Sequence, residues 1–223
     1  GVVGGDAQPN DTVTLTINGA TYTGLVAADL SFSINVPGSA LANDADRVID
    51  ASVTTTDAAG NSASATDTEG YSVDLTTPSV VVDIVDASLN VADASSQVTF
   101  TFSEAPLGFT AADITATGGT VSGLTATADP LVYTATFNAT AGFEGSGTVN
   151  VTAGSYTNAA GNPGTGNGDT VTIDTTPPAP TITLAANITA DDIINAAEAG
   201  QTIAITGVVG GDAQPNDTVT LTI

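Results

Sequence analysis

Residues Gly1–Ile17 read GVVGGDAQPNDTVTLTI, and residues Gly207–Ile223 repeat this stretch without a change. The two copies lie 207 − 1 = 206 residues apart, so the chain covers slightly more than one period of a long repeat. A second copy of this length does not arise by chance. The sequence therefore predicts a protein built from tandem copies of one unit.

The composition is that of a strongly acidic chain with enough apolar residues for a core. It has 24 acidic residues against one basic residue, Arg47, a net charge of −23, and 41% hydrophobic residues, which is not typical of disorder. Such a charge excludes nucleic acid and anionic membranes as electrostatic partners. No apolar run is long enough to insert into a bilayer, and the absence of Cys excludes a disulfide framework.

The residue types also argue against an enzyme. The chain has no His, Cys or Lys, which removes most general bases and activated nucleophiles. Carboxylate pairs remain, but aromatic residues, on which sugar sites usually depend, make up only 4% of the chain. The oxygen-rich, sulfur-free composition instead favours hard cations as ligands, Ca²⁺ before Mg²⁺. Acidity that merely keeps a surface protein soluble is an equally open interpretation.

Apolar and polar residues alternate along most of the chain, which predicts short strands bounded by turn residues. No stretch has a helical period of useful length, although Asn195–Ala199 has room for one turn, and Pro37–Asp46 is expected to be a polar loop. The predicted strands are Thr12–Asn18, Ala20–Gly24, Leu30–Val36, Arg47–Thr56, Ser62–Leu75, Val80–Val85, Gln97–Phe102, Asp113–Thr117, Leu131–Phe137, Gly147–Thr152, Thr170–Asp174, Pro180–Leu184, Gln201–Val208 and Thr218–Ile223.

A shorter period lies inside the long one. The turn Asp57–Asn61 (DAAGN) matches Asn158–Asn162 (NAAGN) at a spacing of 162 − 61 = 101, and Asp74 matches Asp174 at 174 − 74 = 100. Two related domain types therefore alternate. About seven strands in about 100 residues predict an all-β chain of tandem immunoglobulin-like antiparallel β-sandwich domains.

The phase of the repeat predicts one complete domain and one split domain. Residues 78–177 form the complete domain, residues 1–77 the C-terminal part of the split domain, and residues 178–223 the N-terminal part of its next copy. Half a sandwich exposes sheet edges and core. We therefore expect head-to-tail self-association through the split domain, with disorder of one end as the alternative. The neighbouring identical repeats are the other expected partners.

Acidic and amide side chains collect at the strand ends, where the domains join. Glu104 and the turn Asn158–Asn162 are expected at the end where the chain enters the complete domain, so Asp74 should face them. Asp174 should likewise face Asp212 or Asp217 and the Asp57–Asn61 turn of the following repeat. Oxygen ligands from both sides of a linker suit Ca²⁺, which takes six to eight.

Metal binding and local turn bonding are alternative explanations for these residues. Strands disfavour Asp, which favours metal binding for Asp74 and Asp174. At the two turns, local turn bonding explains the residues equally well. The loop Asp191–Glu198 is a second acidic cluster that does not match the EF-hand spacing. The candidate metal ligands are Asp57, Asn61, Asp74, Glu104, Asn158, Asn162, Asp174, Asp191, Asp192, Glu198 and Asp212.

Three runs of residues resemble a known family. They are TTTDAAGNSASATDTEGYSVD at 54–74, SYTNAAGN at 155–162 and TITLAANITADDIINAAEAGQTIAITG at 181–207, together with the Asp-Thr-Thr-Pro linker. Across essentially the whole chain they are similar to the bacterial immunoglobulin-like extender repeats of large RTX-type surface adhesins that are exported by type I secretion. No RTX-type nonapeptide GGxGxDxxx is present.

The resemblance implies a stalk on the outside of a bacterial cell. Tandem domains, stiffened by Ca²⁺ at the linkers, would hold a terminal adhesive domain away from the surface for adhesion or biofilm formation. It also implies that Asp74, Asp174 and the Asp191–Glu198 loop are metal positions. The competing interpretation is a module that itself binds glycan, protein or ice, but no exposed aromatic cluster or flat Thr array favours it.

Overall fold

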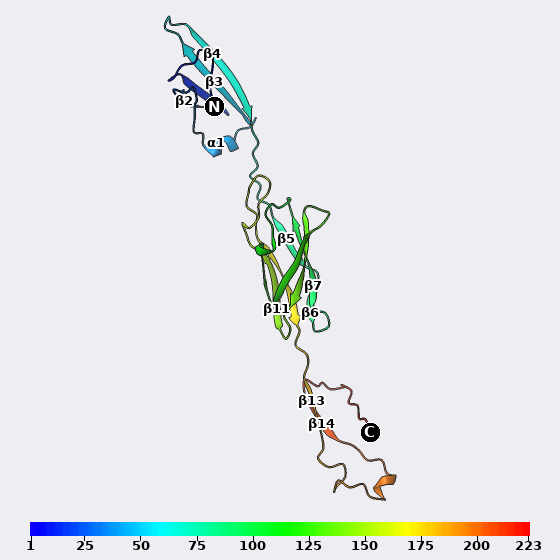
Figure 1. The fold of residues 1–223 in the computed structure, drawn as a ribbon. Helices are drawn as coiled ribbons and strands as arrows, with labels where there is room; N and C mark the ends of the chain where they lie inside the picture. The colour runs from blue at the N-terminus through cyan, green and yellow to red at the C-terminus, as the bar shows by residue number, and fades with distance from the viewer. The chain divides into compact units, whose positions relative to one another are not determined.

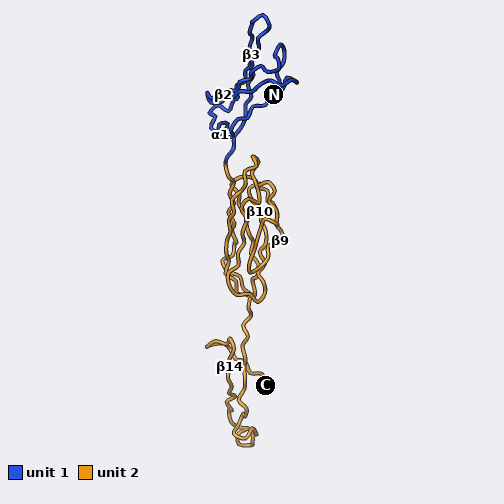
Figure 2. Tube along the Cα trace, turned by 90° about the vertical axis from the view of Figure 1, so that its left-hand side faces the viewer, with its two compact units in different colours: residues 1–75 blue, residues 76–223 orange.

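The computed structural model describes all residues 1–223, and its regular secondary structure is almost entirely β-strand (Figure 1). It divides into two compact units, Gly1–Leu75 and Thr76–Ile223 (Figure 2). No helix is both long and apolar enough to span a membrane. The all-β immunoglobulin-like fold class is confirmed, whereas the predicted domain limits at residues 77 and 177 stay predictions.

The first unit is one antiparallel four-stranded sheet in the order β2-β1-β3-β4. Asn18 and Gly19 both have positive φ (46° and 76°), which is the tight hairpin turn that this dipeptide predicts. Alternation places Val13 and Ile17 of the first strand in the core. The strands are β1 Thr12–Ile17, β2 Ala20–Leu25, β3 Val48–Thr56 and β4 Ser62–Gly70.

Three predictions in this unit are wrong. Leu30–Val36 is not a strand but makes one bridge, Ser31 to Val2, because Leu30 has a φ of +63° and Asp29 caps Ser31. The predicted loop after it contains the short helix α1 (Gly38–Ala42), whose last three residues, Ala40–Ala42, are good helix formers. The strand predicted to reach Leu75 ends at Gly70.

Arg47 and Tyr71 hold the end of α1. Nη1 of Arg47 donates to Leu41 O and Ala42 O at 3.1 and 2.6 Å, which satisfies carbonyl groups at the C-terminal end of the helix. The Tyr71 hydroxyl donates to Asp44 Oδ2 at 2.8 Å, and burial together with this bond raises the pKa of Tyr71. The buried Asp44 therefore has a structural role in this unit.

The second unit contains a complete sandwich of two four-stranded sheets, β5-β7-β10-β9 and β6-β12-β11-β8. Its core is continuous between the sheets and includes Phe100, Phe137 and Val149, all with no exposed surface. The strands are β5 Val80–Ile84, β6 Ser88–Asn90, β7 Ser95–Phe102, β8 Ile114–Thr117, β9 Gly119–Ala126, β10 Val132–Ala139, β11 Glu144–Val151 and β12 Asn167–Asp174, with the 3-10 turn η1 at Ala111–Asp113.

Two strands of this sandwich escape prediction. Strand β6 is only three residues long, too short for an alternation pattern. Strand β9 begins at Gly119, where the Gly118-Gly119 pair suggests a break; a Cβ at Gly119 would lie 2.3 Å from Asn138 O, so glycine permits close approach of β10.

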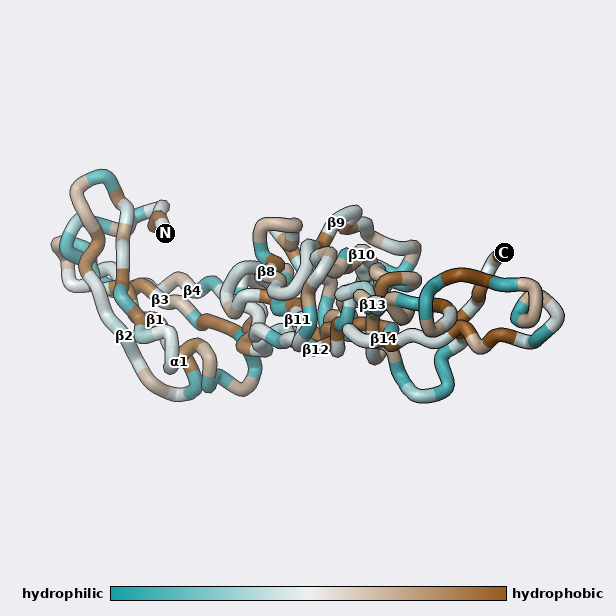
Figure 3. Tube along the Cα trace, turned by 90° about the horizontal axis from the view of Figure 1, so that it is seen from below, coloured by the Kyte–Doolittle hydropathy of each residue, from teal (hydrophilic) through white to brown (hydrophobic).

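Residues 178–223, here named the tail, contain a two-stranded antiparallel ladder of β13 (Pro180–Leu184) and β14 (Gly207–Gly211), and the 3-10 turn η2 (Glu198–Gly200). The strands predicted at Gln201–Val208 and Thr218–Ile223 are wrong, because pairing begins only at Gly207 and no strand lies beyond Gly211. Many hydrophobic side chains of the tail are exposed, and Figure 3 shows brown stretches of its chain toward the C-terminus.

Candidate metal sites

Asn158 lies at the end of the sandwich where the chain comes in, here named the incoming end. Its side chain is 1% exposed. Oδ1 accepts from the N–H groups of Ala160 and Asn162 at 3.1 and 2.9 Å, while Nδ2 donates to Thr76 O at 3.1 Å and to Glu104 Oε2 at 3.0 Å. One amide thus connects the turn, the incoming backbone and Glu104 in the loop after β7.

The chemistry of this cluster gives Glu104 and Asn158 different roles. Both polar atoms of the Asn158 amide are engaged, so the amide orients the carboxylate of Glu104. That half-buried carboxylate and nearby carbonyl groups are the hard oxygen atoms that Ca²⁺ prefers. Asp74 belongs to the first unit, and a metal site that joins it to Glu104 stays a prediction.

The Asp57–Asn61 turn has the same bonding pattern as its counterpart in the sandwich. Oδ1 of Asp57 accepts from the N–H groups of Ala59 and Asn61, both at 2.9 Å, and Asn61 Nδ2 donates to Oδ2 at 2.9 Å. These bonds, the Asn61 amide first, hold the pKa of the exposed Asp57 carboxyl below its ordinary value. Both carboxylate oxygens serve the turn, which favours turn bonding at this position.

Asp174 ends β12 at the opposite end of the sandwich. It stands directly across the ladder from Glu144 of β11 and beside Asn90 of β6, and its Oδ1 accepts from Thr176 N–H at 3.2 Å. Two carboxylates in opposed positions repel each other, and a bound cation relieves that repulsion. Glu144 is not among the predicted ligands, because only the strand register brings it to Asp174.

The acids of the tail cap nearby backbone groups. Asp212 Oδ2 accepts from Ala179 N–H at 2.8 Å. In the predicted acidic loop, Asp191, Asp192 and Glu198 accept from the N–H groups of Ile193, Ile188 and Asn195. The structure has no group of three or more acidic side chains close enough to hold a metal ion. A site at any of these places would draw on amide, carbonyl and water oxygens as well.

Three solved structures of bacterial adhesins are similar to this chain. A Ca²⁺-stabilised adhesin that helps an Antarctic bacterium reach out and bind ice is 33% identical, over 94% of this chain and 51% of that one, with a TM-score of 0.60. A structure concerning host cell surface retention of a 1.5-MDa bacterial ice-binding adhesin is 30% identical, over 96% and 68%, with a TM-score of 0.52. A bacterial immunoglobulin-like domain from the M. primoryensis ice-binding adhesin is 49% identical over 32% and 69%, with a TM-score of 0.31.

The chain spans about half the length of the first of these structures, covering 51% of it. No curated protein matches it. The sequence profile of a family described as a bacterial Ig-like domain matches residues 74–175, which contain all eight strands of the sandwich. Together with the similarity that runs along 96% of the chain, this match means that the chain belongs to the family of bacterial immunoglobulin-like domains.

Proposed function

We propose that this chain is a structural extender of a large bacterial adhesin, a series of stalk domains outside the cell that projects a distal adhesive domain for adhesion or biofilm formation. The observation that carries the proposal is the 206-residue repeat of immunoglobulin-like domains. Identical units in series suit a spacer, since each one adds length without adding a new binding surface.

The path of the chain through the sandwich supports a spacer. Pro78 O accepts from Thr165 N–H at 2.9 Å, so the chain comes in beside the start of β12, and it leaves after Asp174 at the end of the same strand. A strand of 8 residues spans about 25 Å. Incoming and outgoing segments therefore lie at opposite ends of the domain, as repeated extension requires.

We further propose that Ca²⁺ binds at the two ends of the sandwich. The residues that fit are Glu104 at the incoming end and Asp174 with Glu144 at the outgoing end, helped by backbone carbonyl groups. Bound Ca²⁺ supplies positive charge to a chain of net charge −23. At the incoming end Asn158 holds the Glu104 carboxylate and Thr76 O in one network, so an ion on Glu104 would also restrain the linker.

The expected gain in stability follows from ligand linkage. An ion present at 100 times its dissociation constant stabilises the folded state by about 2.7 kcal/mol per site. This is a large part of the stability of a domain of this size. Removal of Ca²⁺ should therefore lower the melting temperature of the sandwich and loosen the linkers.

The test compares melting curves and small-angle X-ray scattering with Ca²⁺ and with EDTA, for the chain and for its Glu104→Gln variant. We expect EDTA to lower the melting temperature of the wild-type chain, and to lower the melting temperature of the variant by a smaller amount. Identical curves in both solutions would refute the Ca²⁺ proposal.

The extender role is tested by length and by binding. Chains of one, two and three 206-residue repeats should gain a constant increment in maximum dimension. An increment that shrinks with repeat number would contradict a stalk. A glycan array with a clear hit on this chain would instead favour a module that itself binds a ligand.

A further inference from the structure

The first and last strands of the sandwich are joined along most of its length. Strand β6 pairs with β12 in parallel, with Ser88 beside Thr172 and Asn90 beside Asp174. Strand β5 belongs to the other sheet, but side chains of β12 bond to its edge. This line of contact between β5–β6 and β12 is here named the seam. We propose that the seam resists a force that pulls the two ends of the sandwich apart, and that Asp169 is its main side-chain cross-link.

Two side chains of β12 close the edge of β5. Val85 N–H donates to β7 at 3.0 Å, and bonded positions alternate in an antiparallel ladder, so the N–H groups of Val82 and Ile84 point away from β7. Asn167 Oδ1 accepts from Val82 N–H at 3.3 Å, and Asp169 Oδ2 accepts from Ile84 N–H at 2.8 Å. The edge that faces away from β7 is therefore bonded to the last strand.

Further hydrogen bonds continue the seam toward both ends of the sandwich. Thr165 N–H donates to Pro78 O at 2.9 Å at the incoming end, and Thr172 N–H donates to Ala87 O at 3.2 Å beyond β5. The buried Tyr156 hydroxyl lies 3.3 Å from Pro78 O and 3.0 Å from Thr165 O. Residue numbers rise together on both sides of the seam, so the seam is parallel throughout.

The parallel direction decides how the seam responds to tension. The chain enters the sandwich at the start of β5 and leaves it at the end of β12, which are opposite ends of the seam (Figure 1). Tension between these two points slides β5–β6 along β12, so it loads all the cross-links together. Tension applied at one end of the seam would instead break them one after another. Because several bonds must break at once in the first case, the barrier to unfolding is higher.

Asp169 is the strongest side-chain cross-link of the seam. Its carboxylate is half-buried, which limits competition by water, whereas Asn167 is exposed and its bond is longer. A hydrogen bond to a charged acceptor is roughly twice as strong as a neutral one. Residues 76–177 contain no Lys or Arg, so no cationic side chain of the sandwich competes with Ile84 N–H for this carboxylate.

This inference deepens the proposed function, because tension along the chain is what a stalk that holds an adhesive domain would bear. The force measurement does not depend on the length of the repeat, and Ca²⁺ is held at one concentration throughout. A failure of the length test or of the EDTA test is therefore a separate result from a failure of the seam.

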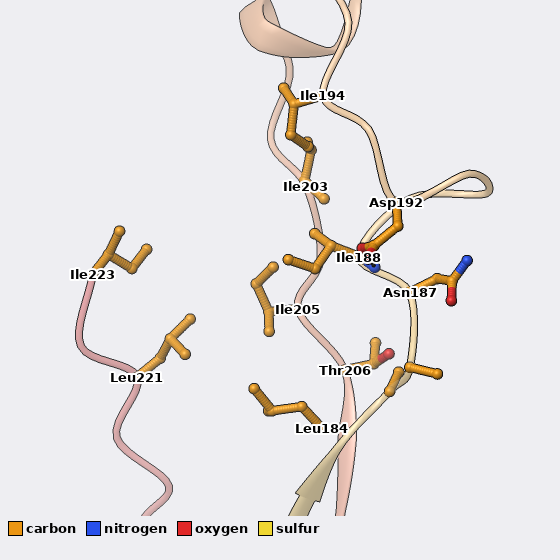
Figure 4. Close-up of a pocket in the computed structure, with 12 residues that line it drawn as sticks. Leu184, Asn187, Ile188, Asp192, Ile194, Ile203, Ile205, Thr206, Leu221 and Ile223 are labelled. Atoms are coloured by element: carbon orange, nitrogen blue, oxygen red, sulfur yellow. Dashed lines mark hydrogen bonds between the residues drawn. The ribbon is translucent and has the colours of Figure 1, made fainter.

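The direction of pulling is tested by single-molecule force measurements on the full chain, which has no cysteine of its own. Thr77→Cys with Thr176→Cys places handles at opposite ends of the seam, and Thr77→Cys with Thr165→Cys places both at the incoming end; all three side chains are exposed. We expect the first pair to unfold the sandwich at the higher force. These positions keep force off the tail, which has one two-stranded ladder beside an apolar hollow lined by Leu184 and Leu221 among others (Figure 4).

The cross-link is tested with handles at opposite ends of the seam. Asp169→Ala removes the acceptor for Ile84 N–H and should raise the unfolding rate at a given force about tenfold. Asp169→Asn keeps an acceptor oxygen, as Asn167 already provides, and should restore most of the resistance. Asp113→Ala is the matched control, because this half-buried carboxylate accepts from Thr110 N–H at 2.7 Å within a turn outside the seam.

Urea unfolding of each variant measures its equilibrium stability, which separates a general loss of stability from a loss of resistance to force. The Asp113→Ala chain should lose equilibrium stability but keep a wild-type unfolding rate under force. Three results would each overturn the proposal. They are equal unfolding forces for the two handle pairs, a wild-type unfolding rate for Asp169→Ala, and an acceleration by Asp113→Ala as large as that by Asp169→Ala.

Discussion

The amide of Asn158 connects three segments at the incoming end of the sandwich, and its removal predicts a measurable loss of stability. Asn158→Ala deletes the acceptor for the N–H groups of Ala160 and Asn162 and the donor to Thr76 O and Glu104. A neutral hydrogen bond contributes about 0.5 to 1.5 kcal/mol net, and one to a charged group about 1.5 to 3 kcal/mol.

We do not expect the loss of stability to equal the full sum of these four contributions. Ala160 and Thr76 are exposed, so water replaces part of what they lose, whereas the site of Asn158 itself is buried. We predict a loss of about 2 to 4 kcal/mol in the free energy of unfolding of the sandwich. With a urea dependence of about 1 to 2 kcal/mol per molar, the midpoint should fall by about 2 M.

The assay is unfolding in urea, monitored by hydrogen exchange of peptides from β7 and β11. Because these two strands belong to the sandwich, their exchange assigns the transition to that domain. Asn158→Asp is the matched control. It keeps the acceptor for the turn, as Asp57 does in the first unit, but it loses both donors and sets a second carboxylate beside Glu104. Without Ca²⁺ it should be at least as unstable as Asn158→Ala, and Ca²⁺ should restore the Asp variant only.

Two results would refute this reasoning. An Asn158→Ala chain with the wild-type midpoint would mean that the four bonds contribute nothing net. An Asn158→Asp chain that is as stable as wild type in EDTA would mean that the donors to Thr76 and Glu104 do not hold the incoming segment.

Three further predictions concern single side chains. Phe137→Ala, at a position with no exposed surface, should cost about 3 to 5 kcal/mol and lower the calorimetric transition of the sandwich; a change below 1 kcal/mol would contradict its place in the core. Tyr156→Phe loses a hydroxyl that donates to Thr165 O at 3.0 Å and should cost about 1 kcal/mol in urea unfolding, with an unchanged midpoint as the contrary result. The lowered pKa of Asp57 means that its turn stabilises the fold above the ordinary carboxyl pKa and loses this contribution as pH falls through the lowered value. A carbon-detected NMR titration should find the Asp57 pKa below that of a model peptide, and Asp57→Asn, which copies the Asn158 turn, should remove this part of the pH dependence.

The sequence was sufficient to predict the strands that have one apolar face and one polar face. Alternation located β7 and β10, whose inward residues Val98, Phe100, Ala135 and Phe137 are buried, and Asn18-Gly19 located the first hairpin. The same pattern failed over Leu30–Val36. There Phe32 and Ile34 are half-buried, but the backbone turns at Leu30 and forms no ladder. Alternation reports which side chains face a core, and it does not report whether a neighbouring strand is present.

The candidate sites also depend on contacts between segments that are distant in the sequence. The matching turns at residues 57–61 and 158–162 could be found by their spacing, and the shared bonding of Asp57 and Asn158 explains why both types of residue serve there. The opposition of Glu144 to Asp174 depends on the register of β11 against β12, which adjacent residues do not encode. Glu104 and Asn158 were expected at the same end of the domain, but the hydrogen bond between them depends on the packing of two loops 54 residues apart.

The repeated stretch separates local preference from tertiary context more directly than any mutation. Thr12–Ile17 is a strand between β2 and β3, with Val13 2% and Ile17 1% exposed. The identical residues Thr218–Ile223 form no strand, with Val219 59% and Ile223 110% exposed. The first half of the stretch behaves in the opposite way, since GVVGG forms a strand ladder only where β13 is present. Each copy therefore forms the part of the sheet for which a pairing strand is present, because the neighbouring strands and not the sequence of the stretch decide whether it becomes a strand.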